Sequence, residues 1–324
     1  MNGPDPAIAA VRTAVRDFLA VAGKPGELCV AVSGGADSLA LAEAAAFTGT
    51  RAGLTVRALV VDHGLQDGSA ETAARAADTA RELGVHSAEV LRVRVEGAGG
   101  PEAAARRARY RALRSALGDG HGVVLLGHTL DDQAETVLLG LGRGSGPRSL
   151  AGMRPHDPPW GRPLLGVTRA TTRKACQALG VDPWQDPHNE DPRFTRVRLR
   201  TEVLPLLEDV LAGGVAASLA RTAAQLREDT EALDTLADAV HLRAFTEEGL
   251  DVTVLATEPP ALRRRVLRRW LLDSGVRELT DAHLRSVDAL VGNWRGQGGV
   301  WLPGDLVAAR AHGRLWVETP QSTT

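Results

Sequence analysis

The chain has 324 residues, of which 44% are hydrophobic and 24% charged, and its formal net charge is −2. This length allows two domains, and the composition is that of a soluble globular protein. No uncharged apolar run reaches about 18 residues and no secretory signal is apparent, so neither a membrane span nor export is expected. The two widely separated cysteines, Cys29 and Cys176, exclude a C-x-x-C centre and indicate a reducing, cytoplasmic location.

The first part of the chain is predicted to alternate strands with helices. Residues 28–32 are a continuous apolar run, as in a strand buried on both faces, and further strands are predicted at 55–62, 85–95 and 123–126. Helices are predicted at 6–20, 39–47, 71–83 and 101–117. This alternation predicts an α/β fold with a parallel, doubly wound sheet. Four glycines within residues 140–146 predict a mobile loop.

The second part of the chain is predicted to form a smaller domain. Short helices at 168–179 and 194–207 are expected before it, at the end of the first domain. A long helix joining two domains is predicted because apolar residues recur every seven residues, at Leu219, Leu226, Leu233 and Val240. After it we expect a strand, two helices and three short strands, which is an α+β arrangement. The expected domains are residues 1–210 and 211–324.

A glycine- and serine-rich turn follows the first strand. It reads Ser33-Gly34-Gly35-Ala36-Asp37-Ser38, and a helix follows at once. Glycines let backbone N–H groups approach a phosphate at a helix N-terminus, and serines add hydroxyl donors. Asp37 is a hard oxygen ligand suited to the Mg²⁺ that accompanies a nucleoside triphosphate. The turn lacks the lysine of a Walker A loop. An ordinary turn capped by Ser38 would not require this combination, so we predict a phosphate site.

Polar residues also follow two later strands. Asp62 and His63 come after the second strand, at the edge where open α/β sheets bind ligands, so they lie near a nucleotide or are structural. His128 closes the fourth strand, and Asp132 and Glu135 share one face of the next helix. A histidine beside two acids suits proton transfer and metal binding. Helix capping is the alternative role for acids in a first turn.

Three basic segments are candidates for binding phosphate or RNA. Arg106, Arg109 and Tyr110 fall on roughly one side of a predicted helix, where guanidinium groups could hold phosphates or form a solvated face. In residues 186–200, three acids, one asparagine and four arginines accompany Phe194. An aromatic side chain among arginines suits a single-stranded RNA contact. The five arginines within residues 263–269 either bind RNA or form a solvated face.

Five motifs of the chain resemble, in order and spacing, those of the tRNA(Ile)-lysidine synthetases, a family of PP-loop ATP pyrophosphatases. They are S-G-G-x-D-S at 33–38, D-H-G at 62–64, E-A-x-A-R-x-x-R-Y at 102–110, G-H-x-x-D-D-x-x-E-T at 127–136 and D-P-x-N-x-D-x-x-F-x-R at 186–196. The first is shared by PP-loop enzymes, whereas the last is nearly private to this family. The chain resembles a short form without the last C-terminal domain of longer members.

The resemblance implies a ligase that uses ATP and Mg²⁺. ATP would adenylate the first anticodon cytidine of tRNA(Ile) with a CAU anticodon, and free L-lysine would displace AMP to give lysidine. The resemblance implies no membrane partner and leaves monomer and homodimer both open. On this chain, the implied ATP site is Ser33, Gly34, Gly35, Ala36, Asp37, Ser38, Asp62 and His63, with Asp37 and Asp132 as metal ligands. The implied catalytic residues are Asp37, His128, Asp132 and Arg106. Lysine or tRNA would contact Glu135, Arg109, Asn189, Asp191, Phe194, Arg196 and Arg200.

Two alternatives remain at this point. One is another PP-loop enzyme, such as a tRNA thiolase or an amide ligase, although the chain lacks the cysteines of cluster-dependent thiolases and a glutaminase domain. The other is a non-catalytic module that binds ATP and RNA, against which the intact set of acids argues. In the lysidine reading, the second domain would bind the tRNA.

Overall fold

The computed structural model describes residues 3–23, 25–66, 68–96, 100–118, 122–144, 146–186 and 191–319. The chain divides into two compact units, Met1–Ala224 and Gln225–Thr324. The division lies within α10 (Val215–Ala244), the long helix that the seven-residue repeat predicts. Each unit has its own hydrophobic core.

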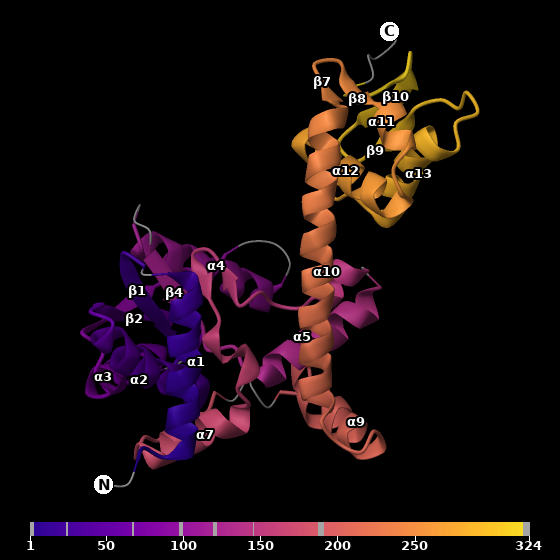
Figure 1. The fold of residues 1–324 in the computed structure, drawn as a ribbon. Helices are drawn as coiled ribbons and strands as arrows, with labels where there is room; N and C mark the ends of the chain where they lie inside the picture. The colour runs from indigo at the N-terminus through magenta and orange to yellow at the C-terminus, as the bar shows by residue number, and fades with distance from the viewer. Residues whose placement is uncertain are drawn as a thin grey trace. The chain divides into compact units, whose positions relative to one another are not determined.

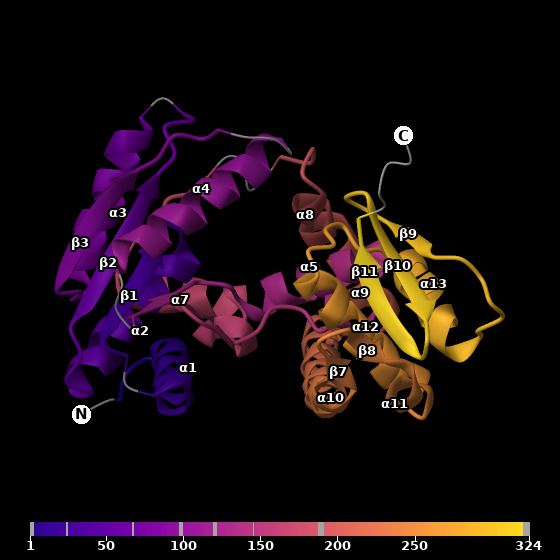
Figure 2. The same cartoon turned by 90° about the horizontal axis from the view of Figure 1, so that it is seen from above.

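The first unit is built on a six-stranded sheet in the order β3-β2-β1-β4-β6-β5. Figure 1 labels β1, β2 and β4 of this sheet together with the helices α1, α2 and α3. The main strands β1 (Glu27–Val32), β2 (Val56–Asp62), β3 (Ser87–Arg92) and β4 (Gly122–Leu125) are parallel. Figure 2 shows β3, β2 and β1 running side by side. Short strands β6 (Trp160–Gly161) and β5 (His156–Asp157) extend the sheet beyond β4, and only the β5–β6 pairing is antiparallel within it. The predicted α/β fold with a doubly wound parallel sheet is confirmed.

Helices cover both faces of this sheet, which explains why residues 28–32 of β1 are all apolar. Leu28 and Val30 pack into a core shared with α1 (Pro6–Ala22), α2 (Ala36–Arg51), α3 (Ser69–Glu82) and α7 (Arg169–Ala178). Cys29 points to the opposite face, where it packs with Leu113 of α4 (Pro101–Ala116). Burial raises the pKa of the Cys29 thiol to about 12, so this cysteine is an inert core residue.

The glycine-rich segment after β4 differs from its prediction. The helix α5 (Leu130–Arg143) continues through Gly140, so the expected loop was wrong for residues 140–143. A side chain at Gly140 would collide with the backbone of Ser149 in the next helix, α6 (Pro147–Leu150). Gly140 therefore permits close packing of two helices, and its role is not flexibility. The proline-rich segment that follows contains β5, β6 and a 3₁₀ turn at Pro163–Gly166. None of these three elements was predicted from the sequence.

A continuous but irregular helical stretch ends the first unit. It consists of α8 (Thr195–Arg198), a π-helix at Leu199–Val203 and α9 (Leu204–Val210). No single helix in the described part of the chain is long and apolar enough to cross a membrane. The helical segments Thr195–Val210 and Val215–Ala244 are long and apolar enough only when they are counted together, and they meet at a bend of 95°. Their length and composition are the only features that suggest a membrane span.

The second unit is a small α+β domain, as predicted. Its antiparallel sheet has the order β7-β8-β11-β10-β9. The strands are β7 (Phe245–Thr246), β8 (Gly249–Asp251), β9 (Val300–Leu302), β10 (Leu306–Ala311) and β11 (Arg314–Glu318). Helices α11 (Val252–Ala256), α12 (Pro260–Asp273) and α13 (Asp281–Gly292) share a core with one face of the sheet, through residues such as Leu267, Leu290 and Leu315.

Candidate active site

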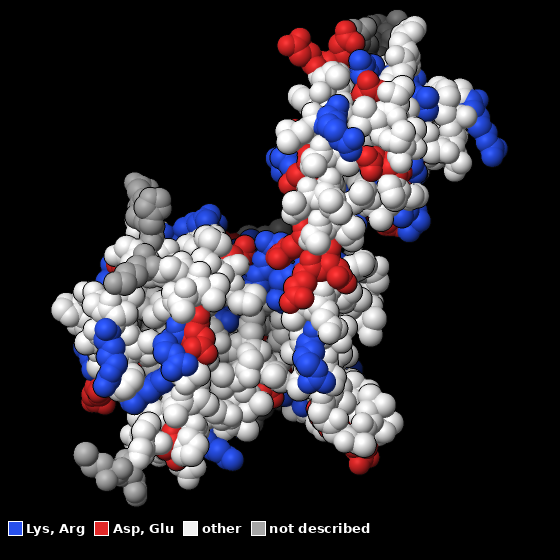
Figure 3. Space-filling view, viewed as in Figure 1, with Lys and Arg blue, Asp and Glu red and all other residues white. Residues whose placement is uncertain are grey.

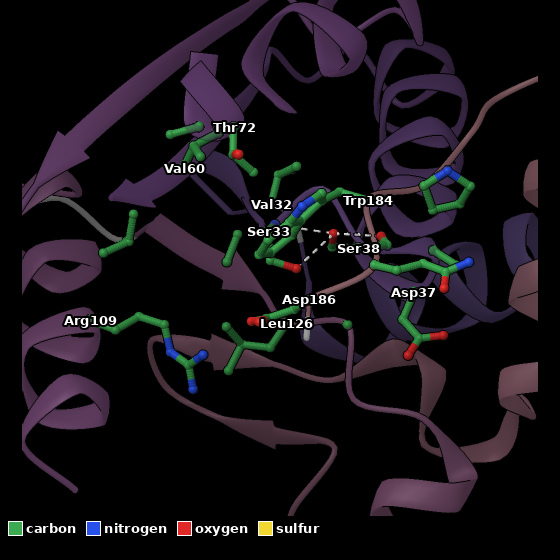
Figure 4. Close-up of a pocket in the computed structure, with 18 of the residues that line it drawn as sticks. Val32, Ser33, Asp37, Ser38, Val60, Thr72, Arg109, Leu126, Trp184 and Asp186 are labelled. Carbon is green, nitrogen blue, oxygen red and sulfur yellow. Dashed lines mark hydrogen bonds between the residues drawn. The ribbon is translucent and has the colours of Figure 1, made fainter. Parts of the chain in front are cut away.

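A cavity of about 1270 Å³ opens where β1, β2 and β4 end. Its walls come from the turn after β1, the residues after β2 and β4, the helix α4 and the start of α7, together with Trp184 and Arg200. Figure 4 shows Ser33, Asp37 and Ser38 on one side of this space, with Arg109 extending into it from α4. The cavity therefore lies at the sheet edge where open α/β folds bind ligands.

The turn after β1 is held in shape by Ser38. Its hydroxyl donates to the Gly35 carbonyl at 2.9 Å and accepts from the Ser33 N–H at 3.1 Å. Gly34 has a φ of +83°, which favours glycine, and its carbonyl accepts from the Trp184 N–H at 3.0 Å. No side chain caps the N-terminus of α2, whose first turn borders the cavity. The N–H groups of Ser38 and Leu39 donate to the Gly35 carbonyl at 3.1 Å, so those of Ala36 and Asp37 are the ones that could meet an anion.

Asp37 lies in the first turn of α2 and points away from that turn toward α7. Thr172 donates a hydrogen bond to Oδ1 of Asp37, and Nε of Arg169 lies 3.6 Å from Oδ2. Burial raises the pKa of Asp37 above its usual value, while Thr172 and Arg169 act in the opposite direction. Gly127 makes this arrangement possible, since a side chain there would lie 3.2 Å from the Asp37 backbone.

Asp132 has two roles at the start of α5. Its Oδ2 accepts from the Thr129 N–H at 2.8 Å and from the Thr129 hydroxyl at 2.9 Å, which completes a capping box. Its Oδ1 accepts from Nη2 of Arg169 at 2.6 Å. Burial alone would raise the pKa of Asp132, but Arg169 and the Thr129 N–H outweigh burial and hold that pKa below its usual value. Asp132 is therefore an ionised carboxylate.

Glu135 is fully buried one turn further along α5 and is surrounded by guanidinium groups. Nε of Arg200 lies 2.8 Å from Oε1, Nη1 of Arg196 lies 3.5 Å from Oε2, and Nη2 of Arg169 lies 3.6 Å from Oε1. The Arg169 N–H also donates to Asp131 at 2.8 Å. We call this set the acid–arginine cluster; its members are Asp37, Asp131, Asp132, Glu135, Arg169, Arg196 and Arg200.

Arg109 and two histidines form a less compensated part of the cavity. No described carboxylate forms an ion pair with Arg109, and burial lowers the pKa of its guanidinium. Burial lowers the pKa of His128 to about 3, with Arg162, Arg109 and Arg106 adding to the effect and Asp132 opposing it. Burial and the positive charge of Arg109 lower the pKa of His63, whereas the nearby Asp62 acts to raise it. Both histidines are buried at Nδ1 without a hydrogen-bond partner among the described residues.

The structure brings together most, but not all, of the residues that the sequence singled out. The cavity is lined by Ser33, Gly35, Ala36, Asp37, Ser38, Asp62, His63, Arg109, His128, Asp132 and Arg200. Arg106 is exposed and donates from Nη2 to the Tyr110 hydroxyl at 3.2 Å. Asp191 pairs with Arg193, and neither Asp191 nor Phe194 lines the cavity. Asn189 lies outside the described residues.

Arg169 and Thr172 are the site residues that sequence reasoning missed. Both lie in the first turn of α7, which begins at the Thr168 N-cap. Their sequence context, T-R-A-T-T-R-K, is that of an ordinary exposed helix start. Only the packing of α7 beside α2 brings Arg169 and Thr172 to Asp37. No local signal could have identified them.

Most of the arginine run on α12 serves its own unit. Arg263 is buried against Asp288 at 2.5 Å, and Arg265 pairs with Asp234 at 3.0 Å. Arg269 pairs with Asp238 at 2.5 Å. Figure 3 shows acidic side chains gathered over part of α10. Glu228 and Asp229 are exposed residues of this helix, so its acidic face does not suit an RNA backbone.

Comparison with known proteins places this site in a family. Residues 9–207 match the family described as PP-loop domain, and residues 250–316 match the TilS substrate binding domain. The tRNA(Ile)-lysidine synthase of Rhodococcus opacus is 58% identical over 316 residues, which cover 96% of this chain and 95% of the relative. That of Nocardia farcinica is 60% identical over 313 residues, covering 94% and 96%. The chain belongs to the tRNA(Ile)-lysidine synthase family.

Membership of the tRNA(Ile)-lysidine synthase family confirms the resemblance seen in the motifs. It makes the chain a tRNA-modifying ligase with a PP-loop domain that uses ATP. A solved structure of the U34-tRNA thiolase NcsA from Methanococcus maripaludis, with its [4Fe-4S] cluster, superposes with a TM-score of 0.56 at 19% identity. The match covers 68% of this chain and 80% of the thiolase, and it supports the fold alone. Among the described residues, no group of three or more His, Cys, Asp or Glu side chains could hold a metal.

Proposed function

We propose that this chain converts the first anticodon cytidine of tRNA(Ile) with a CAU anticodon into lysidine, using ATP and free L-lysine. The observation that carries the proposal is the presence of two complementary walls in one cavity. An uncapped helix N-terminus with a glycine turn suits phosphate. Asp132 on the other wall, with the fully buried Glu135 one helical turn further along α5, suits an amine. The high identity to named relatives over nearly the whole chain supports the same assignment.

The first step is adenylation of the base. The C2 carbonyl oxygen of the cytidine attacks the α-phosphorus of ATP, an O–P bond forms, and the bond to the β-phosphate breaks with release of pyrophosphate. The N–H groups at the start of α2 and the guanidinium of Arg109 hold the phosphates in line, which is how positioning lowers such barriers. The anticodon base is unpaired, so its entry into the cavity costs little.

Asp37 and Asp132 fit a Mg²⁺ ion that accompanies ATP. Oδ2 of Asp37 and Oδ1 of Asp132 both face the guanidinium of Arg169. The presence of this positive group indicates that the two carboxylates together attract a cation. Mg²⁺ in nucleotide sites commonly takes one or two carboxylates together with phosphate oxygens and waters, so a pair of acids is sufficient. When bound, the ion would offset charge on the departing pyrophosphate.

The second step is attack by lysine. The ε-ammonium group gives up one proton, and the free amine adds to C2. The C–O bond to AMP then breaks, and the nitrogen releases a second proton to solvent, which leaves one N–H in lysidine. Asp132 has a lowered pKa and stays ionised, which suits it to hold the ammonium group. We assign acceptance of the first proton to the carboxylate pair of Asp132, which lines the cavity, and Glu135, which is buried one helical turn further along α5. His128 is neutral at physiological pH because its pKa is near 3, and it can donate or accept a hydrogen bond to the base.

We assign tRNA contacts to the segment around Asp191 and Phe194, to Asn189 and to the second unit. An aromatic side chain close to Arg196 and Arg200 offers stacking and phosphate binding together. The proposed location is the cytoplasm, where tRNA and free lysine occur. Light scattering would tell a monomer from a homodimer.

A two-stage assay tests the function. Purified protein is given ATP, Mg²⁺ and a tRNA(Ile) transcript with a CAU anticodon, and pyrophosphate is measured; L-lysine is then added, and the nucleosides are analysed by mass spectrometry. We expect pyrophosphate in the first stage and lysidine in the second, with a methionine tRNA transcript as the control. Pyrophosphate without use of lysine would instead indicate another PP-loop class. No turnover would indicate a non-catalytic module.

A further inference from the structure

Arg169 occupies the centre of the acid–arginine cluster. Its Nη2 lies 2.6 Å from Oδ1 of Asp132 and 3.6 Å from Oε1 of Glu135, and its Nε lies 3.6 Å from Oδ2 of Asp37. The side chain is 14% exposed. A planar guanidinium presents five donors in a rigid fork, which suits contact with several carboxylates at once, whereas a lysine ammonium is a compact point charge with three donors.

The acids of the cluster have little capacity left for another cation. Oδ2 of Asp132 is taken by the N–H and hydroxyl of Thr129, so Oδ1 is the atom that faces Arg169. Glu135 is fully buried and already contacts Arg200 and Arg196. Four acids face three arginines in the cluster, so its charge is nearly balanced. An incoming ammonium group, like the Mg²⁺ ion assigned to Asp37 and Asp132, would therefore compete with Arg169 for the same oxygens.

An anion on the neighbouring wall offers Arg169 another partner. Asp37, which Nε of Arg169 approaches, belongs to the first turn of α2, and that helix N-terminus has no side-chain cap. Phosphates bound there would lie beside the guanidinium. Guanidinium groups bind phosphate as readily as carboxylate, so bound nucleotide would compete for Arg169 against Asp132.

We propose that Arg169 is the resting occupant of the amine subsite at Asp132 and Glu135, and that nucleotide phosphates must draw it away before lysine binds. This inference rests on the proposed function, because it takes lysine as the second substrate. Arg169 is then a specificity-determining residue that orders binding, with nucleotide first. Linkage is reciprocal: if nucleotide lowers the Kd for lysine by some factor, lysine lowers the Kd for nucleotide by the same factor.

Calorimetry of L-lysine binding tests the order. The wild-type chain is titrated with and without α,β-methylene-ATP in Mg²⁺ buffer, a nucleotide that cannot be cleaved at the α–β position. We expect the Kd for lysine to fall at least tenfold when the nucleotide is present. In Arg169→Gln, lysine should bind without nucleotide, and the effect of nucleotide should shrink to less than threefold. Arg169→Lys keeps a positive charge without the planar fork, and its effect should be intermediate.

The matched control is Arg57→Gln. Arg57 also pairs with two acids of the first unit, Glu27 and Glu89, but it does not line the cavity. This variant should keep the wild-type coupling. The proposal is overturned if the wild type binds lysine equally with and without nucleotide, or if Arg169→Gln keeps full coupling. Should Arg169→Gln fail to fold, Arg169→Lys decides, and full wild-type coupling in that variant overturns the proposal. The lysidine assay separates the two proposals. If lysidine forms while the coupling is absent, only the binding order is wrong; if no lysidine forms, the proposed function itself is wrong.

Discussion

The two walls of the cavity are prepared in opposite ways. At the glycine turn, the first N–H groups of α2 have no side-chain cap and Arg109 has no carboxylate partner among the described residues. At the acid–arginine cluster, every carboxylate contacts a described arginine through its side chain or backbone. The first wall is open to an anion, whereas the second already holds cations. This contrast indicates that the two substrates meet different barriers on binding.

The largest expected effect comes from removing Asp37. We expect Asp37→Ala to lower pyrophosphate release by about 10³-fold or more, because a carboxylate that can hold a metal beside the phosphates is lost. The affinity for tRNA(Ile), measured by filter binding, should stay within about twofold, since Asp37 lies at the phosphate wall. Loss of tRNA affinity with normal turnover would contradict this assignment.

Breaking the open wall at Arg109 should have a smaller effect. In Arg109→Gln, kcat/KM for ATP should fall by about 10²-fold, as for loss of one preorganised donor. Burial disfavours the charged form of this guanidinium, so the same change should leave the melting temperature equal to or above that of the wild type. A lower melting temperature with unchanged kcat/KM would show a structural role instead.

Breaking the occupied wall at Glu135 should affect lysine and stability together. Glu135→Gln leaves Arg200 and Arg196 without their buried partner, which should cost about 3 kcal/mol of folding free energy. The KM for lysine should rise by about tenfold, from the loss of one charge-assisted contact, while pyrophosphate release changes by less than about twofold. Equal loss in both stages of the assay would show that Glu135 acts through the fold alone.

The smallest expected effect is a change in how stability depends on pH. The folded chain resists protonation of His128, whose pKa is near 3, whereas the unfolded chain takes up this proton near pH 6.5. Stability from this group is therefore present above pH 6.5 and is lost as the pH falls toward 3, by about 2 kcal/mol between pH 7 and pH 5. In His128→Asn, the drop in unfolding free energy between these pH values should be smaller by that amount. An unchanged drop would place the titration at another group, such as His63.

The same contrast explains what could be predicted from sequence. The glycine turn depends on six consecutive residues between a strand and a helix, so its geometry is local and readable. The acid–arginine cluster depends on Arg169 and Arg200, which reach α5 from elements far along the chain. The glycines of residues 140–146 suggested a loop because composition carries no information on whether a neighbouring helix such as α6 packs closely. Local chemistry could be predicted, and tertiary neighbours could not.

The number of residues in the π-helix at Leu199–Val203 sets how α8 is rotated relative to α9. A π-helix carries one more residue per turn than an α-helix, so α8 and α9 are out of phase by about 100° across it. Arg196 lies before this wide turn and Arg200 lies within it, and both reach Glu135. Deleting one residue between positions 199 and 203 would retain nearly every side chain. It would nevertheless rotate α8 relative to α9, and Arg196 would turn away from Glu135. Spacing, and not only residue identity, is thus part of how this site is encoded.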